Sequence, residues 1–258
     1  MPDALLKVDE LEVGYGRRTR THREKAVVRD VSFVIAPRET LALVGESGSG
    51  KTTVARAVAG LAKPWDGRME FEGAPLGHAR THAQRRNLQM VFQDPRSSLN
   101  PRMSVEGIIG EAWRTHPDSA PPRPFRSGVL ALLDQVGLPA TAIEQRPRQL
   151  SGGQCQRVSI ARALALSPEL IVCDEAVSAL DVSVQAQIIQ LLIDLKSERG
   201  LSLLFITHDL GVVRQIADRC AVMKDGVLVE MGETQEIFTN PRDPYTVELL
   251  SAALDIRA

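Results

Sequence analysis

A glycine-rich segment between an apolar run and a helical pattern is the feature that most constrains the fold. Residues 45–52 read GESGSGKT, after the run TLALV and at the start of KTTVARAVAGL. Two glycines, a lysine and a Ser/Thr at this spacing form the phosphate-loop pattern. A strand, a glycine-rich turn and a helix in this order direct backbone N–H groups and the positive end of the helix at one anion. The segment therefore predicts a phosphate-binding loop, and the alternative is a turn without a ligand.

The residues of this loop have different expected roles. Lys51 can reach the outer phosphates of a nucleotide, and Thr52 can ligate magnesium. The helix that follows is expected to bury one face, formed by Val54, Ala57, Val58 and Leu61. The whole set expected to bind the nucleotide here is Gly45, Glu46, Ser47, Gly48, Ser49, Gly50, Lys51, Thr52 and Thr53.

Two adjacent acids end the apolar run ELIVCDE. Open parallel sheets place their ligands at the carboxyl ends of strands, so Asp174 and Glu175 are candidates for chemistry. We expect Asp174 to hold magnesium through water and Glu175 to polarise an attacking water as a general base. The alternative is a solvated strand end, because adjacent acids are common on surfaces.

The rest of the chain reads as an α/β fold. Alternating apolar residues at 6–13 and at 31–35 (Val31, Phe33, Ile35) predict an early antiparallel sheet. Strands and helices then alternate after Ser151, which implies a mostly parallel sheet with helices on its faces. Other expected elements are the strands RMEFEG and LQMVFQ, the helices VEGIIGEAW and VLALLDQVGL with Gly137 as a C-cap, a loop at HPDSAPPRPFRSG, and a hairpin around Asp225-Gly226.

Composition excludes several classes of protein. The 31 basic and 32 acidic residues leave a formal charge of -1, so no global footprint for nucleic acid or anionic lipid exists. The basic loop at 17–25 permits a nucleic-acid reading, but a solvated connection suits the neutral chain better. Cys155, Cys173 and Cys220 lack metal-ligand spacing and suit a reducing compartment. We expect them to fill the core.

No targeting or membrane segment is apparent. The first residues, MPDALLKVDELEVGYG, carry acids and lack a basic segment followed by an apolar run. No stretch reaches the roughly 18 to 20 consecutive apolar residues that a membrane-spanning helix needs. We therefore expect a cytosolic protein that reaches a membrane only through another subunit.

A second glycine motif lies about 100 residues after the loop. Leu150 to Gln154 read LSGGQ at the start of a helical pattern, where adjacent glycines free backbone N–H groups for an anion. Taken alone, SGG is more often a helix cap. LSGGQ is the signature of the ATP-binding cassette family, and the order of the motifs, rather than any one of them, makes nearly the whole chain resemble that family.

The resemblance implies a fold and its boundaries. It implies a P-loop NTPase core with a RecA-like, mostly parallel sheet, an N-terminal antiparallel β subdomain and an inserted α-helical subdomain. In a single ABC ATPase domain at 1–258, residues 1–93 and 156–232 would form the nucleotide-binding core. Residues 94–155 would form the helical subdomain, which ends in the signature, and 233–258 a C-terminal tail.

The resemblance also implies ATP and Mg2+ as ligands and a second ABC ATPase subunit as partner. In this family the signature of one subunit closes over the ATP held by the other's phosphate loop. Two sites then form only in a sandwich dimer, which can pair identical or different subunits. The signature residues expected to contact ATP in this way are Ser151, Gly152, Gly153 and Gln154.

Three more residues match positions with a known role in the family. Tyr15 in VGYG matches the tyrosine that stacks on adenine, although a surface tyrosine is the plain alternative. Gln93 matches the glutamine that contacts magnesium and senses the γ-phosphate. His208 matches the histidine that contacts the γ-phosphate, with a core or surface histidine as its alternative.

The turn after the acid pair matches the family with one exception. Residues 178–181, which end at Asp181, match the loop that crosses the dimer interface. Ala176 stands where most members have proline, which loosens the turn slightly. The acids are intact, so we expect a competent site that uses Glu175, His208 and Lys51 in catalysis and Thr52, Gln93 and Asp174 around the metal.

Two longer segments give a narrower resemblance. FQDPRSSLNPRMSVEGII and IFTNPRDPYTVELLSA are similar to the ATPases of bacterial peptide and nickel importers. This similarity implies peptide or nickel-complex uptake, a separate permease docked in a groove within 93–151, and indirect contact with a periplasmic or extracellular solute-binding protein. It also implies peripheral attachment to the cytoplasmic face of the inner membrane, and no nucleic-acid partner. The cargo and the choice between homodimer and heterodimer stay open.

Other ATPases with cassettes fit less well. A DNA-repair ATPase would need a far longer coiled-coil insertion, and a translation-associated ATPase would need two cassettes. A soluble cassette of an exporter or of a non-transport multienzyme complex remains an alternative. No cysteine follows Cys220, so we expect no iron–sulfur cluster in the tail.

Overall fold

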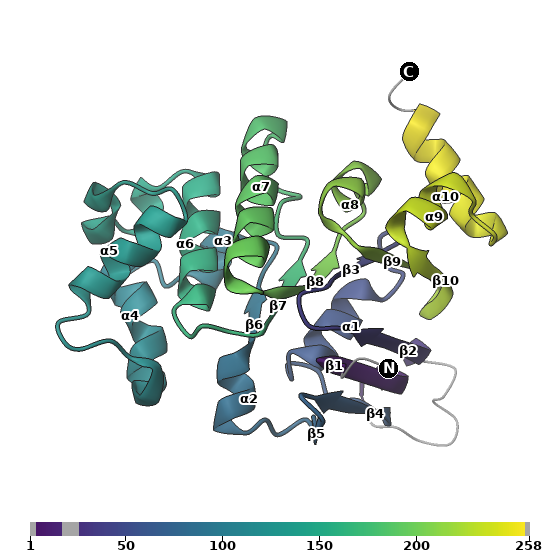
Figure 1. The fold of residues 1–258 in the computed structure, drawn as a ribbon, viewed down its shortest axis with the longest axis horizontal. Helices are drawn as coiled ribbons and strands as arrows, with labels where there is room; N and C mark the ends of the chain where they lie inside the picture. The colour runs from purple at the N-terminus through teal and green to yellow at the C-terminus, as the bar shows by residue number, and fades with distance from the viewer. Residues whose placement is uncertain (1–3, 17–25, 256–258) are drawn as a thin grey trace.

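The fold consists of two sheets and a group of helices beside them (Figure 1). The computed structural model describes residues 4–16 and 26–255. The basic loop at 17–25 lies outside the described residues, so the structure does not test its interpretation.

The smaller sheet is antiparallel and begins the chain. Its strand order is β2-β1-β4-β5, and its first two strands pair with Val8 opposite Phe33. Val31, Phe33 and Ile35 all face the core, as their alternation predicts. The strands are β1 (Leu6–Gly14), β2 (Ala26–Ile35), β4 (Asp66–Phe71) and β5 (Ala74–Pro75).

The larger sheet is mostly parallel. Its strand order is β10-β9-β3-β8-β7-β6, and only the β9–β10 pair is antiparallel. That pair is the expected hairpin, with Asp225 at φ 47° and Gly226 at φ 84° in its turn. The strands are β3 (Thr40–Val44), β6 (Leu88–Val91), β7 (Leu170–Asp174), β8 (Ser202–Ile206), β9 (Arg219–Lys224) and β10 (Val227–Glu233).

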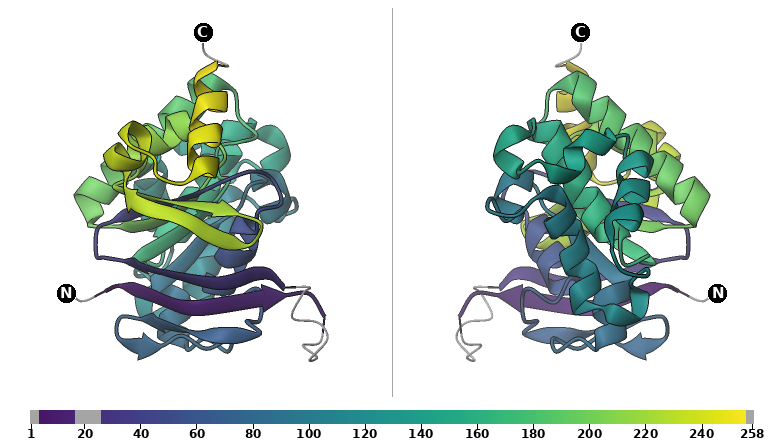
Figure 2. Two further views of the ribbon diagram at one scale, coloured as in Figure 1. Left: turned by 90° about the vertical axis from the view of Figure 1, so that its right-hand side faces the viewer. Right: turned by 90° about the vertical axis from the view of Figure 1, so that its left-hand side faces the viewer.

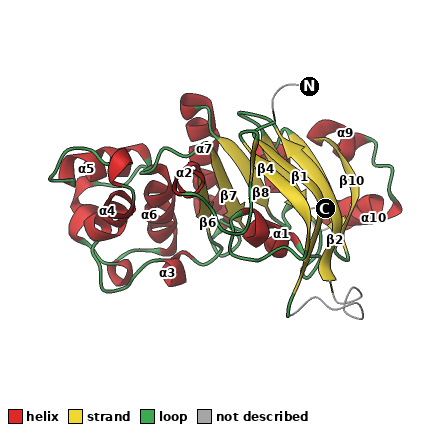
Figure 3. Ribbon diagram, turned by 90° about the horizontal axis from the view of Figure 1, so that it is seen from below, coloured by secondary structure: helices red, strands yellow, loops and turns green. Residues whose placement is uncertain are grey.

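Helix α1 (Lys51–Val58) follows the phosphate loop and contacts strands of both sheets (Figure 3). Val54, Ala57 and Val58 are fully buried in the core that the sheets share. The expectation for Leu61 was wrong, since its side chain is 58% exposed. The helix ends at Val58, and Gly60 turns the chain with φ 77°, so position 61 no longer shares the helical face.

A group of helices extends the molecule on one side (Figure 1). Gly137 follows α5 with φ 66°, and the Leu138 N–H bonds back to the Leu133 carbonyl, as in a helix C-terminus. The proline-rich stretch holds a short 3-10 turn and a loop, and only its end enters α5. The elements of this part are α2 (His82–Asn87), α3 (Pro95–Ser98), α4 (Val105–Thr115), η2 (Pro117–Ser119), α5 (Arg126–Gln135), η3 (Ala140–Glu144), η4 (Pro147–Gln149) and α6 (Gly152–Leu164).

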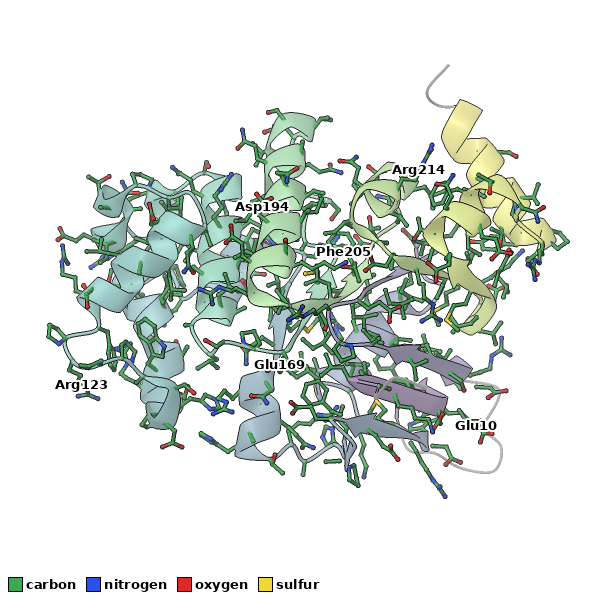
Figure 4. All side chains as sticks on the ribbon, in the orientation of Figure 1. Glu10, Arg123, Glu169, Asp194, Phe205 and Arg214 are labelled. Carbon is green, nitrogen blue, oxygen red and sulfur yellow. The ribbon has the colours of Figure 1, made fainter. Side chains whose placement is uncertain are left out.

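The remaining helices cover the large sheet and the C-terminal end (Figure 2). They are α7 (Val182–Arg199), α8 (Leu210–Ile216), α9 (Thr234–Thr239) and α10 (Pro244–Asp255). Phe205 on β8 is fully buried near the middle of the molecule, whereas Arg123 lies at the far end of the helical part (Figure 4). All three cysteines are buried, as expected. Among the described residues, no helix combines the length and apolarity needed to cross a bilayer.

Candidate active site

The carboxyl ends of the parallel strands meet at one edge of the large sheet. Leu43 of β3 and Asp174 of β7 both lie opposite Ile206 of β8 in the pairing register. Backbone bonds continue past the strands, since Glu175 N donates to Ile206 O at 3.0 Å. The loop after β3, the acid pair after β7 and the turn after β8 are therefore at one level.

The phosphate loop has a shape that only glycine permits at its start. Gly45 has φ 144°, and a Cβ built there would lie 2.1 Å from the Met223 carbonyl oxygen. The loop thus packs directly on strand β9, with no room for a side chain. The β9–β10 turn also holds it, because Gly226 N donates to Ser49 O at 3.0 Å.

Lys51 is a buried cation inside this loop. Its side chain is only 4% exposed, and its Nζ donates to Gly45 O at 2.8 Å, to Glu46 O at 2.7 Å and to Ser49 Oγ at 3.3 Å. All three acceptors are neutral oxygens. Burial lowers the pKa of Lys51, while Glu175 and Asp174 partly oppose this effect. A phosphate beside this ammonium would supply the charge that its neighbours lack.

Thr52 and Asp174 form a second contact at the same edge. The hydroxyl of Thr52 donates to Asp174 Oδ1 at 2.8 Å. Burial raises the pKa of Asp174, and the bond from Thr52 and the charge of Arg56 oppose the shift. A hydroxyl and a carboxylate side by side fit Mg2+, which binds oxygen ligands and takes few of them from protein when phosphates are present. No cluster of three or more His, Cys, Asp or Glu side chains suited to a metal occurs in residues 4–16 and 26–255.

Glu175 brings three segments of the chain together. Gln93, two residues beyond β6, donates from Nε2 to Glu175 Oε2 at 2.7 Å. His208 Nδ1, beyond β8, lies 3.6 Å from Glu175 Oε1. The backbone of Glu175 has φ 47°. This left-handed conformation is energetically unfavourable for any residue other than glycine, and such strained residues cluster at functional sites. A turn fixes it, because Ser178 Oγ donates to Glu175 O at 3.0 Å.

A cavity of about 400 Å3 brings together Lys51, Thr52, Gln93 and Glu175, whereas Asp174 and His208 are not among the residues that line it. Tyr15 stands at its rim, 66% exposed, with its hydroxyl 3.5 Å from Thr53 Oγ1. The cavity is thus lined both by an exposed aromatic ring and by a buried lysine. Its lining residues are Tyr15, Val27, Ser47, Gly48, Gly50, Lys51, Thr52, Thr53, Gln93 and Glu175.

The signature residues lie elsewhere in this chain and form a helix start. Ser151 caps α6 by accepting from Gln154 N at 3.2 Å, and Gln154 Oε1 accepts from Ser151 N at 2.9 Å. Gly153 lets α6 approach α7, since a Cβ there would lie 2.4 Å from Val184 Cγ1. Gly152 lies beside Leu180. None of these four residues lines the cavity at Lys51.

Asp181 also has a local role in the single chain. Its Oδ1 accepts from Val184 N at 3.0 Å and from Ser183 Oγ at 2.8 Å, which caps α7. These hydrogen bonds lower the pKa of Asp181. Like the signature, Asp181 is absent from the lining of the cavity.

Two residues that contact the site at the loop were not predicted from the sequence. Val27 of β2 lines the cavity, and Tyr245 of α10 accepts a hydrogen bond from Glu46 N at 3.2 Å. Val27 is one of many valines in strands, so no local signal distinguishes it. Tyr245 is 199 positions from its partner, a separation that no short motif covers.

The fold and the site define a P-loop ATPase. A model of the family described as ABC transporter matches residues 28–178, more than half of the chain. The chain belongs to the ABC transporter family.

Relatives with high identity cover most of the sequence. The oligopeptide transport ATP-binding protein OppF of Escherichia coli is 51% identical over 228 residues, which are 87% of this chain and 68% of that protein. The oligopeptide transport ATP-binding protein AmiF of Streptococcus pneumoniae is 43% identical over 256 residues, covering 98% and 82% respectively.

Solved structures share the architecture. CbiO1 from Clostridium perfringens, part of the ABC transporter complex cbiONQ, superposes with a TM-score of 0.79 at 27% identity, over 99% of this chain and all of that one. The ATP-binding cassette MJ0796, in a dimeric post-hydrolysis state with ADP and Pi, gives a TM-score of 0.75 at 28% identity, over 89% and 98%. These neighbours confirm the expected α/β P-loop fold.

Proposed function

We propose that this chain binds MgATP at the Lys51 loop and hydrolyses it to power uptake of peptides, or of a related small solute such as a nickel complex, through a separate permease. The observation that carries the hydrolytic part is the meeting of Gln93 and His208 at the carboxylate of Glu175, which lines the same cavity as Lys51. The relatives named for oligopeptide transport support the cargo class.

The loop would bind the phosphates of ATP. Its backbone N–H groups and the positive end of α1 face the anion, and Lys51 would bind the outer phosphates. Mg2+ would be held by Thr52, the Gln93 side-chain oxygen and, through water, Asp174, and would neutralise charge on the outer phosphates. Tyr15 would stack on adenine at the rim of the cavity, where its ring is exposed.

Hydrolysis would depend on Glu175. Its carboxylate would accept a proton from water as the water oxygen attacks the γ-phosphorus, and the bond to the bridging oxygen would break with its electron pair going to ADP. Gln93 orients this carboxylate through the bond to Oε2. His208, whose Nδ1 lies 3.6 Å from Oε1, would contact the γ-phosphate.

The site would be completed by a second ABC ATPase subunit, identical or different. The start of α6 carries two glycines, and its residues 151–154 lie outside the cavity of their own chain. In a sandwich dimer this helix start would meet the γ-phosphate held by the partner, and Asp181 would lie at the contact between the subunits. The reported dimer of a related cassette with ADP and Pi supports this arrangement.

The membrane partner would dock on the helical side of the molecule. We assign residues 1–93 and 156–232 to the nucleotide-binding core, 94–155 to the helical subdomain and 233–258 to the tail. Helical residues between Gln93 and Ser151 would form the groove for the permease. The protein would then sit at the cytoplasmic face of the inner membrane, with a solute-binding protein acting on the other side.

Uptake by the reconstituted complex tests this function. The chain is purified with its multispanning subunits, placed in vesicles with MgATP, and assayed for entry of labelled peptides. Lys51→Ala is the inactive control variant. We expect uptake that requires ATP and is lost in Lys51→Ala. ATP-driven efflux, or a chain that associates with no membrane subunit, would contradict the import function.

A further inference from the structure

Tyr245 of the C-terminal helix lies against the backbone of the phosphate loop. Its side chain is 5% exposed, and its hydroxyl accepts a hydrogen bond from Glu46 N at 3.2 Å. Glu46 is the second residue of the loop. The contact joins α10 to the nucleotide site from the side away from the cavity, which Tyr245 does not line.

The same peptide unit also contacts Lys51. The Glu46 N–H and the Gly45 carbonyl belong to one planar peptide group, in which the N–H and C=O bonds point in opposite directions. The N–H donates to Tyr245, and the carbonyl accepts from Lys51 Nζ at 2.8 Å. A rotation of this plane would therefore break both bonds together. The carbonyl of Glu46 adds a second acceptor to the same ammonium at 2.7 Å.

Two contacts hold Tyr245 itself, and a third residue holds the segment that precedes it. Lys224, at the end of β9, places Nζ 4.3 Å from the centroid of the Tyr245 ring, and Asp243 Oδ1 accepts from Tyr245 N at 2.8 Å. Glu230 of β10 accepts from the backbone N–H groups of Arg242 and Asp243, at 2.8 and 3.1 Å. In the left view of Figure 2, α9 and α10 pack above the β9–β10 hairpin, on the side away from the small sheet.

We propose that Tyr245 is a positioning residue, which sets the peptide plane between Gly45 and Glu46 and so holds Lys51 ready for the phosphates of the nucleotide. This inference rests on the proposed ATP binding and extends it to the tail. The C-terminal helix becomes part of the support of the nucleotide site. Burial raises the pKa of Tyr245, so the phenol stays protonated and neutral at physiological pH.

Calorimetric titration with the magnesium complex of ATPγS tests the inference on the whole chain. Tyr245→Phe keeps the ring and removes only the hydroxyl. Ser251→Ala is the matched control, because it removes an exposed hydroxyl from the same helix, where it bonds to Val247 O. We expect Tyr245→Phe to bind about three- to tenfold more weakly, the effect of one neutral hydrogen bond. Ser251→Ala should bind as the wild type does.

The titration distinguishes a loosened phosphate loop from partial unfolding of the variant. Partial unfolding lowers the stoichiometry of binding, whereas a loosened loop raises the dissociation constant at full stoichiometry. In steady-state hydrolysis by Tyr245→Phe, we expect KM to rise by the same factor as the dissociation constant. We expect kcat to stay within about twofold of the wild-type value, because the substitution does not change Glu175. Equal dissociation constants for Tyr245→Phe and wild type would overturn the inference and leave the proposed function intact. A wild-type chain that binds no nucleotide would overturn both.

Discussion

Gln93 and Glu175 meet side chain to side chain at 2.7 Å, although 82 positions separate them. Two neighbouring parallel strands, β6 and β7, end beside each other and deliver both residues to the same point. The amide of Gln93 thereby fixes one carboxylate oxygen, while His208 lies near the other. The carboxylate is oriented before any substrate arrives, which reduces the reorganisation needed for catalysis.

Replacing Gln93 with alanine should slow hydrolysis without abolishing ATP binding. The carboxylate of Glu175 would lose its partner, and we expect kcat to fall about tenfold, which corresponds to about 1.4 kcal/mol of transition-state stabilisation. Steady-state ATPase rates measure this change. Gln89→Ala is the control: Gln89 lies on β6, four residues before Gln93, and its amide bonds to the Arg85 carbonyl, so this variant should keep the wild-type rate. An unchanged kcat in Gln93→Ala would mean that the contact does not serve catalysis.

Lys51→Ala should remove most of the affinity for ATP. The ammonium is buried among neutral oxygens, so it is available for a phosphate. A charge-assisted hydrogen bond of this kind is worth roughly 1.5–3 kcal/mol, so we expect a loss of about 10- to 100-fold. Equilibrium binding of a fluorescent ATP analogue measures it, with the exposed Lys63→Ala as control. Equal affinity for both variants would argue against the loop as the phosphate site.

The stability of the fold should fall in mild acid because of His116. Its ring is 8% exposed, its centroid lies 4.1 Å from that of His82, and Nδ1 has no hydrogen-bond partner among the described residues. Burial lowers the pKa of His116 below its ordinary 6.5, and the charges of His82, Arg86 and Arg85 act in the same direction. The folded state thus favours the neutral ring. The contribution of the neutral His116 ring to the free energy of unfolding is complete above pH 6.5. It is lost as the pH falls towards the lower pKa that His116 has in the folded state.

Denaturant unfolding at pH 7.5, 6.5 and 5.5 checks the role of His116. We expect the free energy of unfolding to fall less steeply with pH in His116→Phe than in wild type, because phenylalanine does not titrate. His78→Phe, at an exposed position, should keep the wild-type slope. The same slope in all three proteins would assign the acid sensitivity to other groups.

The three thiols should be inert in the native chain. Burial raises the pKa of Cys173 and of Cys220 to about 12 and also raises the pKa of Cys155. Since the thiolate is the reacting form, a thiol reagent such as DTNB should give no fast phase at pH 7.5. All three cysteines should react once guanidinium unfolds the chain. A rapid stoichiometric phase without denaturant would contradict the observed packing.

Local patterns predicted much of the fold, the glycine-rich loop and the pair of acids at a strand end. The loop at 45–52, the acids at 174–175 and the alternation in β2 are short-range signals that specify a turn, a strand end or a buried face. Gln93 was expected only from the family resemblance, and parallel pairing of β6 with β7 explains why it lies at the same edge as Glu175. Leu61 was misplaced because the helical pattern continued past the point where Gly60 turns the chain.

Other features of the site depend on contacts between distant segments. Nothing near Tyr245 predicts that its hydroxyl reaches Glu46, because α10 must first pack on the β9–β10 hairpin. Gly153 is likewise explained by the approach of Val184 from another helix. The sequence also leaves the role of Ser151 divided between a cap and a phosphate ligand. The single chain displays the cap, and the second role is proposed for the dimer.

The most direct test of the proposed catalysis is Glu175→Gln, assayed with radiolabelled MgATP in the complex with the partner subunits, beside the wild-type complex. Glutamine keeps the shape but cannot accept the proton from water, so we expect hydrolysis to fall at least about a hundredfold while bound nucleotide remains ATP. Wild type should convert its bound ATP to ADP under the same conditions. Near-normal turnover by Glu175→Gln would contradict the assignment of Glu175 as the catalytic base.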